Sequence, residues 1–308
     1  MYPLIAKIST TVRNVIKLYR LRFGFLIGAW FAPEATMRRA ADLFCTPFAS
    51  TRSRALAAPT FGAREERLEI DGHSIATYVW GEPQQQPYVL FAHGWSSHGT
   101  RIAKWLPELR AAGYAVVAFD QPAHGRSGGR LATLPDFTSH LFAVGEHYGP
   151  AAAVIGHSLG GAAALLAMAR GMRAERVVLI APAADPVAAM KRFARFLWVG
   201  EDVCRRMFAY FESRIGISLD SQQAHRNAPT IARPALIVHD LDDREVPWSE
   251  GERYARYWPD SRLLSTQGLG HNRIADDGSV IVAALRFLHG EQVGEKVVSS
   301  ENLPYGFA

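Results

Sequence analysis

Cysteine is scarce in this chain, whose 308 residues include only Cys45 and Cys204. Two cysteines allow one disulfide at most, and neither has a second cysteine or a histidine at metal-ligand spacing. The histidines show no His-x-x-x-His or Glu-x-x-His pattern either. We therefore expect two packed, reduced thiols, no metal ion and no cofactor.

Long apolar runs are also absent. A transmembrane helix needs about 20 apolar residues, and the most apolar run here, residues 23–32, ends at Pro33. Its length suits a signal peptide, but the basic segment before it is long and no small-x-small cleavage site follows. The sequence predicts a cytoplasmic protein, with membrane association left open.

Acidic residues are missing from the first 33 positions, which hold five basic ones: Lys7, Arg13, Lys17, Arg20 and Arg22. The net charge of +5 therefore lies entirely in this segment. A nucleic-acid surface usually spreads positive charge over a folded face, so the distribution argues against nucleic acid. An anionic membrane surface remains as a partner.

Residues 4–31 carry apolar side chains at helical spacing. The pattern predicts one or two amphipathic helices with a basic polar face, followed by a helix over 33–44 that begins at Pro33. Together they form an amphipathic helical extension over residues 1–60. Such a helix either packs on its own protein or a second subunit, or makes peripheral membrane contact through residues 1–32.

From residue 61 the pattern changes to strands alternating with helices. Asp71-Gly72 between two alternating runs predicts a hairpin. Continuous apolar strands separated by helices indicate a mostly parallel sheet covered on both faces. The later strands are expected at 88–92, 114–119, 151–155, 176–180, 235–239 and 262–266, and the helices near 101–112, 135–148, 159–171, 248–257 and 279–289.

One gap between strands is too long for a simple crossover. Residues 186–232 show helical patterning with bulky apolar side chains, which predicts a helical lid inserted in a domain over 61–290. Its apolar residues either line an acyl pocket or pack on the body of the protein. Residues 291–308 are expected to form a C-terminal tail.

The chemistry centres on Gly156-His157-Ser158-Leu159-Gly160, which follows one strand and opens a helix. This G-x-S-x-G arrangement places a serine on a tight, strained turn above the sheet. Glycines are required because the strand and helix backbones approach closely at the flanking positions. The helix N-terminus also directs positive partial charge at the site. The pattern predicts that Ser158 is a nucleophile.

Residues 64–290 resemble the α/β-hydrolase superfamily, closest to bacterial esterases, lipases and serine-aminopeptidase-like members. The landmarks are His93-Gly94-Trp95, the run Asp120–Ser127, the Ser158 turn, Asp243 with Val246-Pro247, and Gly270-His271-Asn272. The resemblance implies an eight-stranded α/β-hydrolase fold and a catalytic triad in the chain order Ser, Asp, His. It is specific for fold and chemistry, and much less so for substrate.

Three aspartates compete for the orienting acid. Similar proteins carry glycine-x-x-Asp-x-x-Val-Pro after this strand, and alignment on Val246-Pro247 gives Asp243. Asp242 is the second choice, and Asp240 takes the usual glycine position, a departure from the pattern. His271 is expected to be the general base.

The remaining expectations concern the surroundings of the triad. The resemblance places the oxyanion hole at the backbone N–H groups of Trp95 and Leu159, and makes His93 a loop-stabilising residue beside it. Among the other histidines, His124 is expected to have a structural role and His157 to pack or hydrogen-bond locally. His225 and His239 belong to no motif.

The sequence thus predicts a serine hydrolase that cleaves carboxylic esters of a small-molecule, lipid-like acyl substrate through an acyl-enzyme. Thioesterase and peptidase or amidase activity would use the same residues and stay open, because the pocket decides between them. A non-catalytic binding protein with this fold is an alternative of another class, although such proteins commonly lose the serine or the histidine. The oligomeric state is left open.

Overall fold

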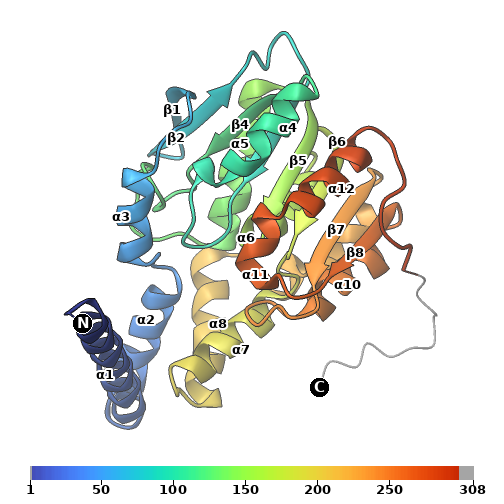
Figure 1. Ribbon diagram of the computed structural model, residues 1–308. Coiled ribbons are helices and arrows are strands. Elements are labelled where there is room, and N and C mark those ends of the chain that lie inside the picture. Colours follow the sequence, from blue (N-terminus) through green and yellow to red (C-terminus); the bar gives the residue numbers. More distant parts are fainter. Residues whose placement is uncertain (1, 298–308) are drawn as a thin grey trace. The chain divides into compact units, whose positions relative to one another are not determined.

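The computed structural model describes residues 2–297, with side chains from residue 12 onward. The chain divides into two compact units (Figure 1). The helical unit combines the chain up to Cys45 with Pro186–Asp220. The body combines Thr46–Asp185 with the chain from Ser221 onward. The C-terminal tail predicted for 291–308 lies outside the described residues from position 298.

The helical unit consists of α1 (Tyr2–Phe31), α2 (Pro33–Phe44), α7 (Pro186–Phe196) and α8 (Glu201–Ile215). The apolar segment near the N-terminus is one continuous helix, and a second helix begins at Pro33 as predicted. Proline fits this first position because its missing N–H would have no partner inside the helix. Phe44 of α2 lies against Phe193 and Phe211, with ring centroids 5.1 and 5.9 Å away. Side chains from α7 and α8 therefore cover one face of α2.

α1 buries only one of its faces within the helical unit. Phe25 is buried, and the Arg39 guanidinium of α2 lies 5.2 Å from the centre of its ring. Tyr19 and Phe23 meet Trp198 edge to face at 5.7 and 5.6 Å. Among the residues described, no helix is long and apolar enough to cross a membrane.

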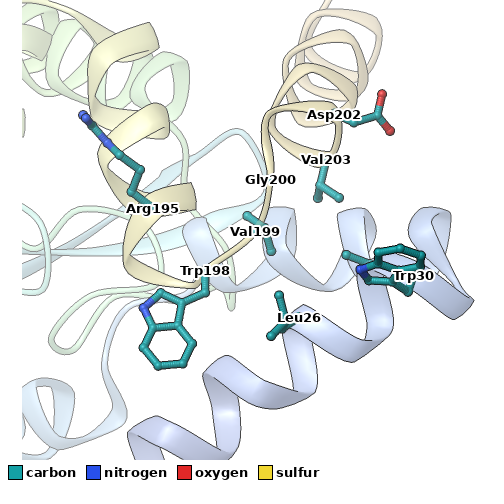
Figure 2. A pocket seen from close by; sticks show the side chains of 9 residues that line it. Leu26, Trp30, Arg195, Trp198, Val199, Gly200, Asp202 and Val203 are labelled. Atoms are coloured by element: carbon teal, nitrogen blue, oxygen red, sulfur yellow. The ribbon is translucent and has the colours of Figure 1, made fainter.

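An open hollow of about 610 Å³ lies in the helical unit (Figure 2). Most of its lining is apolar. The lining residues are Leu26, Ala29, Trp30, Arg195, Trp198, Val199, Gly200, Asp202 and Val203. Trp30 is 85% exposed, so the rim of this hollow presents a large aromatic side chain to solvent.

The body contains one eight-stranded sheet in the order β1-β2-β4-β3-β5-β6-β7-β8. The strands are β1 (Arg64–Ile70), β2 (His73–Trp80), β3 (Tyr88–Ala92), β4 (Ala115–Phe119), β5 (Ala151–His157), β6 (Ala174–Ile180), β7 (Ala235–Asp240) and β8 (Ser261–Thr266). β1 and β2 form the predicted hairpin, and β2 is antiparallel to β4. All later pairs are parallel, which confirms the predicted mostly parallel sheet.

Helices cover both faces of this sheet (Figure 1). Side chains from α5 (Leu134–Tyr148), α6 (Leu159–Ala169) and α10 (Trp248–Tyr257) pack on one face. α4 (Leu106–Ala111) and α12 (Gly278–Leu288) cover the other. Strand residues alternate between the two cores, as the period of a strand requires.

The short elements differ in one place from the prediction. Residues expected to form a single helix over 101–112 form a 3-10 helix, Gly99–Trp105, before α4. Pro107 explains this, because it has no N–H to continue α-helical bonding across the junction. The remaining short helices are α3 (Ala49–Ala57), α9 (Ala224–Asn227), α11 (Gly270–Arg273) and the 3-10 turns Asp220–Gln222, Ala228–Thr230 and Ile274–Asp276.

A substitution at Leu90 tests how much the core of the sheet contributes to stability. Leu90 is fully buried in β3, between Val117 of β4 and Val154 of β5. We expect Leu90→Ala to lower the free energy of unfolding by about 2–5 kcal/mol, because it leaves a cavity between strands and helix. Urea denaturation followed by circular dichroism measures this change. Val282→Ala is the control, since that side chain is 53% exposed on α12, and an equal loss there would contradict the prediction.

Candidate active site

The three residues of the predicted triad follow three parallel strands. Ser158 comes directly after β5, Asp243 lies three residues beyond β7, and His271 lies five residues beyond β8. The carboxyl ends of parallel strands meet at one edge of a sheet, where ligands of α/β folds usually bind. The fold therefore brings together residues that are far apart in the sequence.

Ser158 lies on the tight turn that joins β5 to α6. Its backbone has φ 54° and ψ −120°, a conformation that costs on the order of 1–3 kcal/mol for a residue with a side chain. A Cβ at Gly160 would lie 2.2 Å from the carbonyl oxygen of Ala92, and one at Gly156 would lie 2.7 Å from that of Gly160. Glycine is thus required at both positions because the backbones of β3, β5 and α6 nearly touch.

A chain of hydrogen bonds joins the three side chains. The Ser158 hydroxyl donates to Nε2 of His271 at 2.9 Å, and Nδ1–H of His271 donates to Oδ2 of Asp243 at 2.7 Å. All three residues are buried. This tautomer leaves Nε2 free to accept the serine proton, which is the arrangement that nucleophilic catalysis by serine requires.

Asp243, rather than Asp242, is the carboxylate beside His271. Its other oxygen, Oδ1, accepts the backbone N–H groups of Glu245 and Val246 at 2.8 and 2.9 Å. Burial raises the pKa of Asp243, but hydrogen bonds from His239 and His271 outweigh it and leave the pKa below its usual range. Asp242 is exposed and accepts the Gly268 N–H at 3.0 Å.

The loop after β3 lies against the serine turn. A Cβ on Gly94 would come within 2.9 Å of Cβ of Ser158. His93 accepts the Gln121 N–H at Nε2 (2.9 Å) and donates from Nδ1 to the Gly94 carbonyl (2.7 Å), which confirms its predicted loop-stabilising role. Trp95 follows directly on Gly94, and Leu159 follows directly on Ser158 as the first residue of α6. The residues of the two predicted oxyanion donors therefore adjoin the contact between Gly94 and Ser158.

His124 holds the other end of that loop. It accepts the Ser96 N–H at 3.0 Å and donates to the Pro122 carbonyl at 2.9 Å. The His124 ring also contacts the rings of Trp95 and Phe137, which contact each other. These contacts bear out the structural role predicted for His124.

Two histidines have more specific places than the sequence indicated. Nε2 of His157 donates across 2.9 Å to the backbone carbonyl of His271, 114 residues away. His239, on β7, is fully buried, with its Nε2 3.0 Å from the Val246 carbonyl and 3.4 Å from Oδ2 of Asp243. His239 lies on β7, four residues before Asp243. This position on the strand that leads to Asp243 is the one sequence feature that could have indicated their contact.

The buried histidines predict a specific pH dependence of stability. Burial lowers the pKa of His93, His124 and His157 from 6.5 to about 3. Between pH 6.5 and about 3, these histidines bind protons in the unfolded chain but not in the folded one. Their contribution to the free energy of unfolding is therefore fully present above pH 6.5 and is lost as the pH falls toward 3. Each histidine should lower the free energy of unfolding by up to about 1.4 kcal/mol per pH unit in that window.

Urea denaturation at a series of pH values between neutral and about 5, above the range where most carboxylates titrate, measures this slope. His124→Asn should reduce the slope by the contribution of one histidine. Ser53→Ala, at an exposed position without a titratable group, is the control and should leave the slope unchanged. A free energy of unfolding that does not vary with pH in this window would contradict the expectation.

Comparison with known proteins finds relatives of parts of the chain. A family model described as serine aminopeptidase, S33, matches residues 83–215. A monoacylglycerol lipase of Mycolicibacterium smegmatis is 33% identical over 102 residues, which cover 30% of this chain and 36% of that protein. The chain thus spans about a third of the length of this relative.

Longer matches are more distant. A pimeloyl-[acyl-carrier protein] methyl ester esterase of Xanthomonas campestris is 26% identical over 65% of this chain and 93% of its own length. The crystal structure of a membrane phospholipase A, a bacterial virulence factor, matches 90% of this chain and 98% of its own with a TM-score of 0.58 at 18% identity. With the sheet order and the turn at Ser158, these likenesses show that the chain has the α/β-hydrolase fold.

Proposed function

We propose that this protein hydrolyses carboxylic esters of lipid-like acyl groups through an acyl-enzyme formed on Ser158. The observation that carries the proposal is the hydrogen-bond chain from Ser158 through His271 to Asp243. In this arrangement a serine, a base and an orienting carboxylate have the positions that acyl transfer needs.

The first half of the cycle forms the acyl-enzyme. Nε2 of His271 takes the Ser158 proton while the serine oxygen bonds to the acyl carbon. The tetrahedral intermediate then collapses, the bond between the acyl carbon and the alcohol oxygen breaks, and His271 returns the proton to the leaving alcohol. Asp243 remains ionised throughout, which its lowered pKa supports, and stabilises the imidazolium that forms twice per turnover.

Two backbone N–H groups serve as the proposed oxyanion hole. Leu159 is the first residue of α6, so its N–H has no partner within the helix and points with the helix dipole toward the site. Trp95 N–H is the second donor, on the loop whose Gly94 lies against Ser158. Each such donor is worth about 2.7–4 kcal/mol of transition-state stabilisation.

The second half of the cycle releases the acid. Water takes the place of the alcohol, gives its proton to Nε2 of His271 and attacks the acyl carbon. Collapse of this intermediate breaks the bond to Ser158, whose oxygen recovers the proton from His271. The chain ends the cycle unchanged.

The ester class rests on the activities of two relatives, a monoacylglycerol lipase and a methyl ester esterase. Thioesters and amides would use the same residues. A panel of p-nitrophenyl esters of increasing acyl length, acyl thioesters and aminoacyl amides separates the classes and reports the length of the acyl pocket. The lid predicted for residues 186–232 stays a prediction, and the acyl-length profile bears on it directly.

Ser158→Ala tests the nucleophile. Without its hydroxyl no acyl-enzyme can form, so we expect ester turnover to fall by about 10⁴-fold or more and labelling by a fluorophosphonate probe to disappear. Turnover is measured on the purified protein with the best ester of the panel, and circular dichroism verifies folding. Ser53→Ala, at an exposed position on α3, is the control and should retain both activity and labelling. Ester hydrolysis by folded Ser158→Ala at the wild-type rate would refute the proposal.

We further propose that α1 contacts the surface of an anionic membrane. Apolar side chains at positions 12, 16, 19, 23 and 30 lie on one stripe of the helix at 100° per residue, and all are 46% exposed or more. A second stripe alongside carries Arg13, Lys17 and Arg20. No acidic residue interrupts α1.

These two stripes suit a bilayer interface. Apolar side chains enter the boundary of the acyl region while neighbouring basic groups meet anionic headgroups. Trp30, at the rim of the hollow in Figure 2, belongs to a residue type that favours this interface. Cys45 and Cys204 are buried. Two buried thiols fit the reducing, cytoplasmic location predicted from the sequence.

The triple variant Arg13→Gln, Lys17→Gln, Arg20→Gln tests this contact. Each basic residue near an anionic surface contributes about 1 kcal/mol, so binding to phosphatidylcholine vesicles containing phosphatidylglycerol should weaken roughly 100-fold. Co-sedimentation at low and high salt measures it. Wild-type binding should fall with salt, and Val282→Asp on the body should bind as wild type does. Unchanged binding of the triple variant would refute the contact.

A further inference from the structure

Asp240 is a charged residue at a position where similar proteins carry glycine. It is the last residue of β7 and is fully buried. A carboxylate in such a place is costly unless hydrogen bonds compensate for the lost water. Asp240 lies three residues before Asp243. Its carboxylate can accept hydrogen bonds there, which glycine cannot do because it has no side chain.

The carboxylate of Asp240 accepts hydrogen bonds from two different loops. Oδ2 accepts the Thr266 hydroxyl at 2.7 Å and the Leu269 N–H at 3.0 Å. Oδ1 accepts the N–H of Asp242 at 3.0 Å. Every one of these partners is a donor, so the ionised form of Asp240 fits the site and a neutral side chain would fit it less well.

The two loops are the ones that lead to the proposed base and acid. Thr266 ends β8 and Leu269 lies two residues before His271, whereas Asp242 immediately precedes Asp243. Burial raises the pKa of Asp240, but the hydrogen bonds from Thr266 and from the backbone outweigh it and keep the pKa below its usual range. One ionised group thus links both loops at their bases.

Among the described residues, backbone hydrogen bonds between these two loops extend no further than Leu241, the residue after Asp240. The Leu241 N–H donates to the Thr266 carbonyl at 2.8 Å, and the last paired residues of β7 and β8 are Asp240 and Thr266. Beyond that pair, the link between Asp242 and Gly268 involves an exposed carboxylate. Exposed links of this kind contribute little because water competes for them. Among the described contacts, the buried side-chain links between the two loops are the His271–Asp243 hydrogen bond itself and the Asp240 carboxylate.

We propose that Asp240 is a positioning residue that holds the loops of Asp243 and His271 in register, and so sets the geometry of the acid–base pair. It does not touch the reacting atoms. The inference rests on the proposed function, because it concerns the rate at which Ser158 is activated. Misplacement by about 1 Å of a catalytic group can cost on the order of 100-fold in rate.

Asp240→Ala and Asp240→Asn in the full-length protein test the inference. Alanine removes all three hydrogen bonds, and we expect kcat for the ester substrate to fall roughly 100-fold with KM changed less than about twofold, because substrate binding does not involve this residue. Asparagine keeps one acceptor oxygen and should restore part of kcat. Thr266→Val removes a single bond and should give a smaller loss of the same kind.

Rates are expressed per active site, counted by fluorophosphonate labelling carried to completion, so that a fraction of unfolded protein does not lower them. The initial labelling rate of Ser158 should fall in parallel with kcat. Asp242→Asn is the matched control, since it removes a charge from the same loop and retains an acceptor for Gly268. It should keep kcat within about twofold of wild type.

Wild-type kcat per active site in Asp240→Ala would overturn the inference, as would a loss confined to KM or to the number of labelled sites. If Asp240→Ala does not fold, Asp240→Asn and Thr266→Val decide in the same way, and wild-type kcat in both overturns it. Failure of the proposed function is a separate result, in which the wild-type protein hydrolyses no ester or Ser158→Ala hydrolyses it equally well.

Discussion

The close approach of three backbones at the Ser158 turn is the constraint on which the rest of the site depends. The turn joins the end of β5 to the start of α6. The carbonyl oxygens of Ala92 and His93 lie within 2.5 Å of the position that a Cβ on Gly160 would occupy. The turn can form only if glycine occupies its flanks, and Ser158 then takes a strained conformation. That strain persists because the parallel sheet on one side and α6 on the other fix both ends of the turn.

Neutral histidines then build the frame around this turn. A neutral imidazole has one donor and one acceptor, so a single ring can join two backbone groups of opposite kind. His93 joins Gln121 N–H to the Gly94 carbonyl, and His124 joins Ser96 N–H to the Pro122 carbonyl. Because burial keeps both rings uncharged, they brace the loop after β3 without adding a field that would compete with Asp243.

Local patterns revealed the fold and the centre of the site. Five consecutive residues identify the turn at Ser158, and the resemblance to similar proteins, aligned on Val246-Pro247, favours Asp243 over Asp242. His239 and Asp240 could not be recognised in this way. Their contacts depend on the register between β7 and β8, in which Asp240 meets Thr266, and on loops that return from 26 residues away or more. The sequence also could not show that α1 is one continuous helix, because the spacing of its apolar residues fits one helix or two.

The helical unit is assembled from two stretches of chain that are far apart. α1 and α2 are synthesised before their partners α7 and α8, which follow only after about 140 further residues. At a synthesis rate of 5–20 residues per second, the apolar face of α2, with Met37, Ala40 and Ala41, waits on the order of ten seconds for its cover. Until α7 and α8 have been made, this part of the helical unit lacks the helices that cover α2. The helical unit can therefore complete its packing only after most of the body has been synthesised.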